Sequence, residues 1–380
     1  MAQERAGGES TRGIRLFSIR GIRIAVDYSW FIIFLLVFWS LSAGYLPKNY
    51  PDYTLLTHYV AGLITTLFFF GSILIHELTH SFMAMHLGIK IPDITFFVFG
   101  GMSRLSHEAN TPRAELEIAI VGPLSSFLLA LVFWLLSVAI PLPLPSALLR
   151  YLAVVNTALG IFNLVPGFPL DGGRVLRSLV WLKTGSLTRA TKIASSAGRA
   201  FGALLMTLGV LEVFLGSLIG GLWFFFIGMF LRAMASAGYQ EMVMRKWLES
   251  IHVKELMVRD MVTVPSVLPV RDLINDYFYR YHYRGFPVKR GSSITGTVTI
   301  SEVKKLSPEE TLTRSVEDIM RPLDVSSTIT AEGSLAEALE KMNQEGTGRL
   351  LVLERNTVVG MITKTALLQF LEIKRSVANE

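Results

Sequence analysis

The sequence predicts a polytopic α-helical membrane protein, with six transmembrane helices and a short membrane-associated β-hairpin, followed by a soluble α/β tandem of two repeated units. Of the 380 residues, 51% are hydrophobic and 17% are charged, whereas soluble domains contain about 25% charged residues. Several stretches without Asp, Glu, Lys or Arg are long enough to cross a membrane, which takes about 20 apolar residues. After about residue 250 the composition becomes that of a soluble domain, and an internal repeat begins.

The composition also limits the chemistry. The chain has no cysteine, which excludes disulfides, thiolate metal ligands and cysteine nucleophiles. Any bound metal must therefore be held by histidine and carboxylate. The net charge is +6, but many of the basic residues flank apolar spans, so we attribute them to membrane topology and expect no nucleic-acid partner.

The first part of the chain divides into spans. Residues 1–27 are polar and are predicted to form a cytoplasmic N-terminal segment whose first 13 residues are disordered. The membrane domain is predicted over 28–235, with clear spans near 28–46, 57–85, 115–140 and 149–170. The stretch 200–234 is too long for one ordinary crossing, and Gly216, Gly220 and Gly221 supply a turn in its middle. We therefore expect it to cross twice and to lead into a linker at 236–250.

Charge asymmetry sets the predicted topology. The segment 172–199 carries six basic residues and no acidic residue, so it is expected on the cytoplasmic side together with the N-terminus. Four spans between them satisfy this requirement, and two more return the C-terminal region to the cytoplasm. The predicted location is the cell membrane, with multiple crossings and both termini cytoplasmic.

The strongest chemical signal lies at the end of the second span, where His76, Glu77 and His80 follow a long apolar run. Two histidines four residues apart lie about 40° apart on one helical face, so both imidazoles can reach one cation. Glu77 stands beside them to accept a proton from water. Because ionisable groups near hydrocarbon are costly, their presence there favours a functional site over chance.

Zinc needs a third protein ligand, and the sequence offers two candidates, His86 and Asp171. His86 has the spacing of an extended zinc motif, but Met83 stands where that motif needs glycine, so we interpret His86 as a residue at the helix end. Asp171 is the better candidate. It follows Pro166, Gly167 and Pro169, which must interrupt a helix, and the predicted topology brings it to the same leaflet as the histidines.

Residues 20–235 resemble the site-2 proteases, a family of intramembrane zinc metalloproteases. His76, Glu77 and His80 match the H-E-x-x-H motif of that family, and Asp171 matches the aspartate of its L-D-G motif. The resemblance implies one Zn²⁺ per chain, bound by His76, His80 and Asp171. It implies that Glu77 acts first as general base and then as proton donor to the leaving amine.

Two further segments carry the resemblance. Asn163 matches the asparagine of the family's N-x-x-P-x-x-P-L-D-G stretch, and Gly122-Pro123 is similar to its G-P segment. Asn163 is expected either to donate to the oxyanion or substrate backbone or to satisfy the interrupted helix by a hydrogen bond.

The segment between the second and third spans, Ile94 to Leu105, is predicted to form a hairpin with Gly100-Gly101 at its turn. An exposed strand edge could hold an unwound substrate segment by backbone pairing, and a membrane-associated hairpin is typical of the resembled family. The candidate substrate-binding residues are Phe96, Val98, Gly100 and Gly101. The alternative is a hairpin that packs only against its own spans.

The repeat has a period of about 63 residues: Val253, Glu255 and Met257 recur as Val316, Asp318 and Met320. Each unit is predicted to contain a strand, a helix, two strands and a helix, so the two units should pack as a pair. This resembles a tandem of CBS domains, with repeats at 251–312 and 313–380.

The CBS resemblance implies a nucleotide-binding pattern in which an Asp holds ribose hydroxyls. The first unit has Thr299 and has Glu302 in place of the Asp, whereas the second has Thr363 and Ala366. ATP, ADP or AMP could therefore bind the first unit through Thr299 and Glu302, or the pair could be a purely structural dimerisation module. A homodimer through the CBS pairs is expected.

The resemblance therefore implies a zinc endopeptidase in the lipid bilayer that cuts transmembrane segments of single-span membrane proteins in regulated intramembrane proteolysis. The main alternative is a CBS-gated membrane transporter or channel, which would arrange its intramembrane charges along a pathway. A second alternative is an inactive relative that only binds membrane proteins. Convergence of His76, Glu77, His80 and Asp171 on one site favours the protease.

Overall fold

The structure is a computed structural model that describes residues 13–98, 100–104, 109–355 and 357–378. These residues form two compact units, divided between Val243 and Met244. The disorder predicted for residues 1–13 lies almost wholly outside the described part of the chain.

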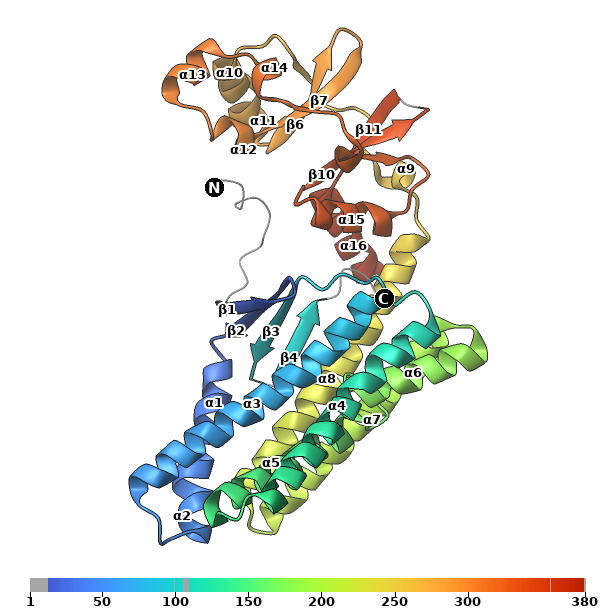
Figure 1. Cartoon of the computed structure of the whole chain (residues 1–380). Coiled ribbons are helices and arrows are strands. Elements are labelled where there is room, and N and C mark those ends of the chain that lie inside the picture. Colours follow the sequence, from blue (N-terminus) through green and yellow to red (C-terminus); the bar gives the residue numbers. More distant parts are fainter. Residues whose placement is uncertain (1–12, 99, 105–108, 356, 379–380) are drawn as a thin grey trace. The chain divides into compact units, whose positions relative to one another are not determined.

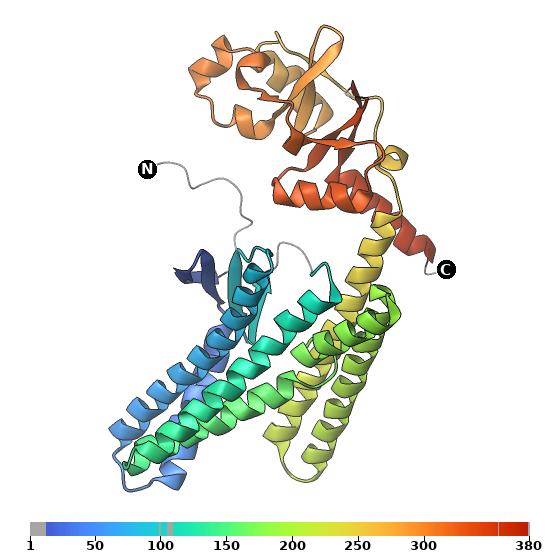
Figure 2. The same cartoon turned by 45° about the vertical axis from the view of Figure 1, so that its right-hand side comes forward.

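The first unit is a bundle of long helices (Figures 1 and 2). In the described part of the chain, six helical stretches are long and apolar enough to cross a membrane, which confirms the predicted number. The first combines α1 (Trp30–Trp39), a π-helical segment η1 (Ser40–Tyr45) and α2 (Leu46–Asn49). The others are α3 (Leu55–His86), α4 (Pro112–Ala139), α5 (Pro143–Asn163), α7 (Leu187–Phe214) and α8 (Leu218–Glu249).

Several predicted span ends were wrong. The fourth helix ends at Asn163 and not at 170, because Pro166 and Pro169 follow and exclude a continued helix. The fifth helix begins at Leu187 and not at 200, since a helix continues through polar residues once it leaves the apolar layer. The predicted turn occurs at Gly216, whose φ is +92°. The sixth helix continues to Glu249, so the predicted linker at 236–250 is almost wholly helical.

A four-stranded sheet lies at one end of this bundle, beside the end of α3 (Figure 1). Its order is β1 (Gly13–Ile19), β2 (Ile22–Asp27), β3 (Asp93–Phe97) and β4 (Gly100–Arg104). β3 and β4 are antiparallel, as predicted, but Gly100 and Gly101 belong to β4 and pair with Phe97 and Phe96. The predicted turn at Gly100-Gly101 was therefore wrong by about two residues.

The sequence analysis did not predict β1 and β2. The signal was present, because Ile22, Ile24 and Val26 alternate with more polar residues and are buried. Between the strands, Arg20 and Gly21 both have positive φ, 48° and 88°, as a two-residue hairpin turn requires. The parallel pairing of β2 with β3 then extends the predicted hairpin into a sheet.

α7 and α8 pack through glycines. A Cβ on Gly202 would lie 2.6 Å from the carbonyl oxygen of Gly228, and one on Gly209 would lie 2.5 Å from that of Gly221. Both distances are too short for any side chain, so the backbones of the two helices touch directly. Such small-residue contacts allow transmembrane helices to approach closely, and they fix α8 against α7.

The second unit contains the two predicted repeats. The first has β5 (Val264–Pro265), a helical stretch made of α10 (Val270–Asp272), η2 (Leu273–Phe278) and α11 (Tyr279–Tyr281), then β6 (Gly285–Arg290), β7 (Ser293–Thr299) and α12 (Ile300–Val303). The short helix α13 (Pro308–Thr313) follows. The second has β9 (Thr328–Thr330), α15 (Leu335–Gln344), β10 (Arg349–Glu354), β11 (Thr357–Thr363) and α16 (Lys364–Ala378). The order of strand, helix, two strands and helix confirms the predicted repeat.

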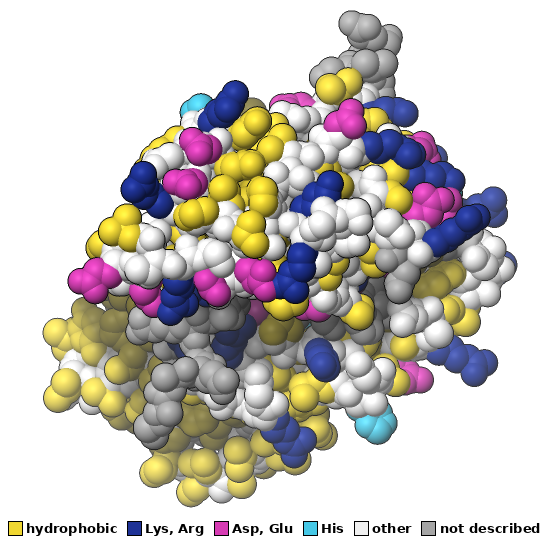
Figure 3. Space-filling model, turned by 90° about the horizontal axis from the view of Figure 1, so that it is seen from above, with side chains coloured by type: hydrophobic (Ala, Val, Ile, Leu, Met, Phe, Trp, Pro, Cys, Tyr) yellow, Lys and Arg dark blue, Asp and Glu magenta, His cyan; other side chains and the backbone are white. Residues whose placement is uncertain are grey.

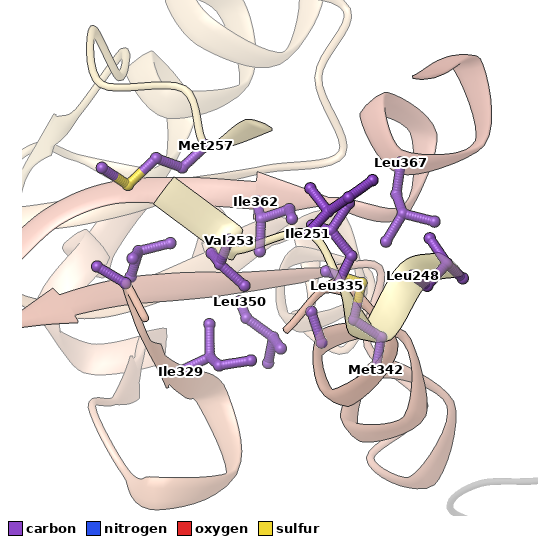
Figure 4. Packing of buried hydrophobic residues seen from close by; sticks show 13 residues of the cluster. Leu248, Ile251, Val253, Met257, Ile329, Leu335, Met342, Leu350, Ile362 and Leu367 are labelled. Atoms are coloured by element: carbon purple, nitrogen blue, oxygen red, sulfur yellow. The ribbon is translucent and has the colours of Figure 1, made fainter. Parts of the chain in front are cut away.

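The head segment of each repeat packs on the other repeat. α9 (Val253–Leu256) contributes Val253 to a buried cluster with Leu335, Leu350 and Ile362 of the second repeat (Figure 4). α14 (Val316–Ile319) contributes Val316 to the core of the first repeat. After each head, β8 (Arg321–Pro322) pairs with β7, and Val258 bridges to Met361. The two repeats are therefore interlocked.

The last turn of α8 also packs in this unit. The last turn of α8 places Leu248 in the same buried cluster (Figure 4), and Trp247 stacks on Phe370 with ring centroids 5.7 Å apart. On the face seen in Figure 3, both acidic and basic side chains are scattered among apolar and other side chains. Charges of both signs are typical of the surface of a soluble domain.

Candidate active site

Three ligand atoms converge in the membrane unit. Nε2 of His76 and Nε2 of His80 each lie 3.1 Å from Oδ2 of Asp171, and the two nitrogens are 3.2 Å apart. These residues form the one group of three potential metal ligands found among the described residues. The two histidines come from α3, and the aspartate is the first residue of α6 (Asp171–Thr184).

The outer nitrogens of both imidazoles are held by α4. Nδ1 of His80 lies 2.6 Å from the carbonyl oxygen of Ile118, and Nδ1 of His76 lies 2.9 Å from Oγ of Ser126. A carbonyl oxygen only accepts, so Nδ1 of His80 donates, and Nε2 of the neutral ring presents its lone pair to the cluster. Such outer partners orient metal-binding histidines.

The donor set fits zinc. Two imidazole lone pairs and a carboxylate oxygen would repel one another at 3.1–3.2 Å without a cation between them. Ligand atoms bound to one tetrahedral zinc at 2.0–2.1 Å lie about 3.3 Å apart, which is close to the observed spacing. His76, His80 and Asp171 would therefore hold a zinc ion, and three protein ligands leave a fourth position open, as catalytic zinc sites require.

A glycine allows α4 to approach this cluster. A Cβ built on Gly122 would fall within the imidazole of His80, far inside van der Waals distance of Nε2. Ile118, Gly122 and Ser126 are spaced four residues apart, so they share one face of α4. On this face, the carbonyl of Ile118 bonds His80, the missing side chain of Gly122 leaves room for the His80 ring, and the hydroxyl of Ser126 bonds His76.

The interrupted chain after α5 delivers Asp171. Added side chains at Gly172 and Gly173 would collide with backbone atoms of Leu164 and Gly167, so the loop folds directly onto the start of α6. The loop is also bound to α7, because the backbone N–H of Phe168 in the loop donates to the carbonyl of Ala194 in α7 at 3.1 Å. The loop is thereby clamped between α6 and α7, which fixes the position of Asp171.

A buried ion pair fixes α6 against α4. Arg177 pairs with Glu115, and both side chains are buried. The guanidinium of Arg177 also lies 5.0 Å from the centroid of the Phe168 ring, in cation–π contact. One arginine thus joins α4, α6 and the loop that precedes Asp171.

Ser126→Ala is expected to lower the affinity for zinc by about 10–100-fold, because the mutation removes the hydroxyl that orients His76. The affinity can be measured by competition with a chromophoric chelator. Ser125→Ala is the matched control, since the hydroxyl of Ser125 bonds the carbonyl of Gly122 within its own helix. Equal affinities for the two variants would contradict the assigned role of Ser126.

The three ligand atoms face a cavity of about 510 Å³. Glu77 and Asn163 line it, as do aromatic residues of α1, α3 and α8, namely Trp30, Phe69, Phe70, Trp223 and Phe230. A Cβ on Gly101 of β4 would lie 2.7 Å from Cγ of Glu77. The edge strand therefore passes directly against Glu77.

The structure brings together most of the residues singled out from the sequence. Phe96, Val98, Gly100 and Gly101 line the same cavity as the zinc ligands. Phe96 is also buried in the core between the sheet and α3. His86 is exposed at the last position of α3, as interpreted from the sequence.

Three features of the site were not predicted from the sequence: the role of Ser126, the contact of Gly122 with His80, and the cavity residue Arg174. The spacing of Gly122 and Ser126 at i and i+4 on an apolar helix was a usable signal for the first two. Nothing in the sequence marked Arg174 among the six basic residues of its segment.

Thr299 and Glu302 lie in the second unit and are already paired with other residues of that unit. Oε2 of Glu302 accepts from the backbone N–H of Thr299 at 3.0 Å and from its hydroxyl, and Oε1 accepts from Nε of Arg321 at 2.7 Å. Burial raises the pKa of the Glu302 carboxyl, but the hydrogen bonds from Thr299 and the charge of Arg321 outweigh it. The net pKa is lowered, so the side chain is anionic at neutral pH.

Comparison with known proteins places these features in a family. The family described as Peptidase family M50 matches residues 64–144 and 143–205, and the CBS domain matches 253–309 and 316–373. The protein sll0528 of Synechocystis sp., named as a zinc metalloprotease, is 33% identical over 371 residues, covering 96% of this chain and 97% of that protein. Zinc metalloprotease MJ0392 of Methanocaldococcus jannaschii is 29% identical over 362 residues, covering 95% and 96%.

Among solved structures, the site-2 protease from Methanocaldococcus jannaschii shares 30% identity with a TM-score of 0.45, covering 59% of this chain and 94% of that one. Fold, site and relatives define a multi-pass zinc metalloprotease of the site-2 type, joined to a CBS pair. The chain belongs to peptidase family M50.

Proposed function

We propose that this protein is an intramembrane endopeptidase that hydrolyses peptide bonds in or near the transmembrane segment of single-span membrane proteins, as a step of regulated intramembrane proteolysis. The convergence of His76, His80 and Asp171 beside Glu77, in a cavity formed by apolar helices, carries this proposal. The even number of candidate spans supports termini on one side of the membrane, and the six basic residues of 172–199 favour the cytoplasmic side of a cell membrane.

The proposed roles follow from position. His76, His80 and Asp171 would hold a zinc ion, which would supply the Lewis acidity that acidifies water and polarises a peptide carbonyl. Glu77 takes the proton from the water that attacks the carbonyl carbon. When the C–N bond breaks, Glu77 gives that proton to the leaving nitrogen.

Asn163 is proposed to donate its side-chain amide to the substrate. It is the last residue of α5 and lines the cavity. An amide donor aimed at the oxygen on which charge develops stabilises the transition state. The position at the end of a helix, directly before the loop that carries Asp171, keeps this donor close to the zinc ligands.

The β4 edge is proposed to hold the substrate in extended form. A helical substrate hides its amides in its own hydrogen bonds, so it must unwind before cleavage. Among the described strands, β4 pairs only with β3, so its other edge can accept a further strand. The close approach of Gly101 to Glu77 would place such a strand beside the general base.

Metal removal tests the proposal. The full-length protein in liposomes, with a panel of single-span substrates, should cut at least one substrate. Cleavage should stop after treatment with a strong zinc chelator and return when zinc, but not magnesium, is added. Persistent cleavage by protein that holds less than about a tenth of an ion per chain would refute the proposed metal chemistry. Failure to cut any panel member while zinc is bound would count against an intramembrane endopeptidase.

The CBS pair is proposed to bind ATP, ADP or AMP through Thr299 and Glu302, and to associate with the pair of a second chain in a homodimer. The carboxylate of Glu302 is engaged by Arg321, whose side chain is 66% exposed and can therefore swing away at little cost. A ribose could replace Arg321 on the carboxylate.

Calorimetric titration of the purified protein with each nucleotide tests this proposal. Glu302→Ala should weaken binding by about tenfold, since hydrogen bonds to a charged group are worth about 1.5–3 kcal/mol. Arg321→Ala should bind at least as tightly as wild type, because it frees the carboxylate. Absence of binding by wild type and Arg321→Ala alike would favour the structural dimerisation module.

A further inference from the structure

α6 carries two arginines three residues apart whose surroundings differ. Arg177 is buried and paired with Glu115. Arg174 is half-buried and lines the active-site cavity. Among the residues that the structure describes, no carboxylate forms an ion pair with Arg174. Arg174 therefore lines a largely apolar cavity, and none of the described residues forms an ion pair with its guanidinium.

An arginine carries its charge at every physiological pH, and a charge in an apolar site is costly unless it is paired. With zinc bound, the described lining of the cavity would carry one net positive charge, because zinc and Arg174 together exceed the two carboxylates of Glu77 and Asp171. This balance attracts an anionic group. A guanidinium matches a carboxylate in geometry as well as in charge.

We propose that Arg174 is a specificity-determining residue that binds an acidic side chain of the substrate. Arg174 lies three residues after the ligand Asp171 on α6, a rise of about 4.5 Å along the helix axis. An extended substrate advances about 3.3 Å per residue, so the acidic side chain lies within about three residues of the cut bond. The preferred substrates thus carry Asp or Glu there. This inference rests on the proposed function.

Cleavage of a charge-scanned substrate tests the proposal. Asp or Lys is placed at each of the three positions on either side of the cut bond of a substrate that wild type cleaves in liposomes of neutral lipid. At one position, wild type should prefer Asp over Lys by about tenfold or more in kcat/KM, the effect of one charge-assisted hydrogen bond. Arg174→Glu should reverse the preference at that same position. Arg174→Lys should retain it in weaker form.

Lys183→Glu is the matched control, because Lys183 is an exposed residue of the same helix that does not line the cavity. It should leave the preference unchanged. A uniform loss with every substrate in Arg174→Glu would mean that Arg174 only supports the fold, and would overturn the proposal. An effect that follows the content of anionic lipid and not the charge of the substrate would assign Arg174 to a lipid phosphate, and would also overturn it.

Binding separates this inference from the proposed function. In the Glu77→Gln background, the affinity for dye-labelled Asp and Lys peptides is measured with Arg174 retained and with the added substitution Arg174→Glu. If the binding preference reverses but wild type cleaves no substrate, Arg174 still binds acidic side chains, and only the proposed proteolytic function is refuted. Equal affinities in all four combinations would overturn the inference, whether or not wild type cleaves.

Discussion

Glu77→Gln is expected to abolish cleavage while leaving one zinc ion bound per chain. Glu77 lies beside the three ligand atoms in the cavity but is not one of them, so the metal does not depend on it. Glutamine keeps the size of the side chain but cannot accept a proton from water. General acid–base catalysis contributes about 10²–10⁴-fold, and Glu77 is assigned both the base step and the acid step, so the loss should reach the upper end of that range.

The measurement combines metal analysis with the rate of cleavage in liposomes. Thr79→Ala is a suitable control on the same helix, since the hydroxyl of Thr79 donates to the carbonyl of Ile75 one turn earlier in its own helix. It should leave zinc and rate close to those of wild type. Glu77→Gln protein that still cleaves at a tenth of the wild-type rate would exclude Glu77 as the general base.

Gly122→Ala is expected to remove zinc and activity together. The added methyl group would occupy the place of the His80 imidazole, and the ring is also held by the carbonyl of Ile118 on the same helix. Either the ring must turn away or α4 must move, and each change breaks up the ligand set. The affinity for zinc should fall by more than about 100-fold, the upper limit for the loss of an outer partner.

Gly71→Ala provides the matched control for this prediction. Gly71 is a glycine of α3, and a Cβ there meets nothing within 4 Å. In the middle of a helix, alanine is favoured over glycine by roughly 0.5–1 kcal/mol, so this variant should keep both zinc and activity. If Gly122→Ala behaves like Gly71→Ala, α4 does not pack against the ligands in the way described.

The pair of variants also separates two kinds of loss. Glu77→Gln should lose cleavage and keep zinc, because only the proton acceptor is gone. Gly122→Ala should lose both, because the ligand geometry is gone. If both variants retained zinc, the metal site would not depend on the face of α4 that carries Gly122.

The sequence by itself determined the number of candidate membrane spans and the identity of the candidate ligands. The length of an apolar stretch indicates whether it can cross a membrane as a helix, because backbone groups in hydrocarbon must form their hydrogen bonds within that helix. The spacing of His76 and His80 indicates that they share one face of a helix, because the direction of a helical side chain depends only on its position along the chain. Asp171 followed from its place after an interrupted helix on the same predicted side.

Tertiary structure alone decided what surrounds these ligands. The sheet partners β1 and β2, the exchange of head segments between the CBS repeats, and the continuation of α8 to Glu249 depend on contacts between distant residues. So does the difference between Arg174 and Arg177, which the chain presents as two similar basic residues.

Gly71 and Gly122 illustrate why the sequence does not reveal how closely two helices pack. Both are glycines within apolar helices. A methyl group added at Gly71 would meet open space, whereas one added at Gly122 would meet the ring of His80. Local sequence encodes helix formation and facing. How closely two helices approach is set by the shapes that meet between them, and only the folded chain brings those shapes together.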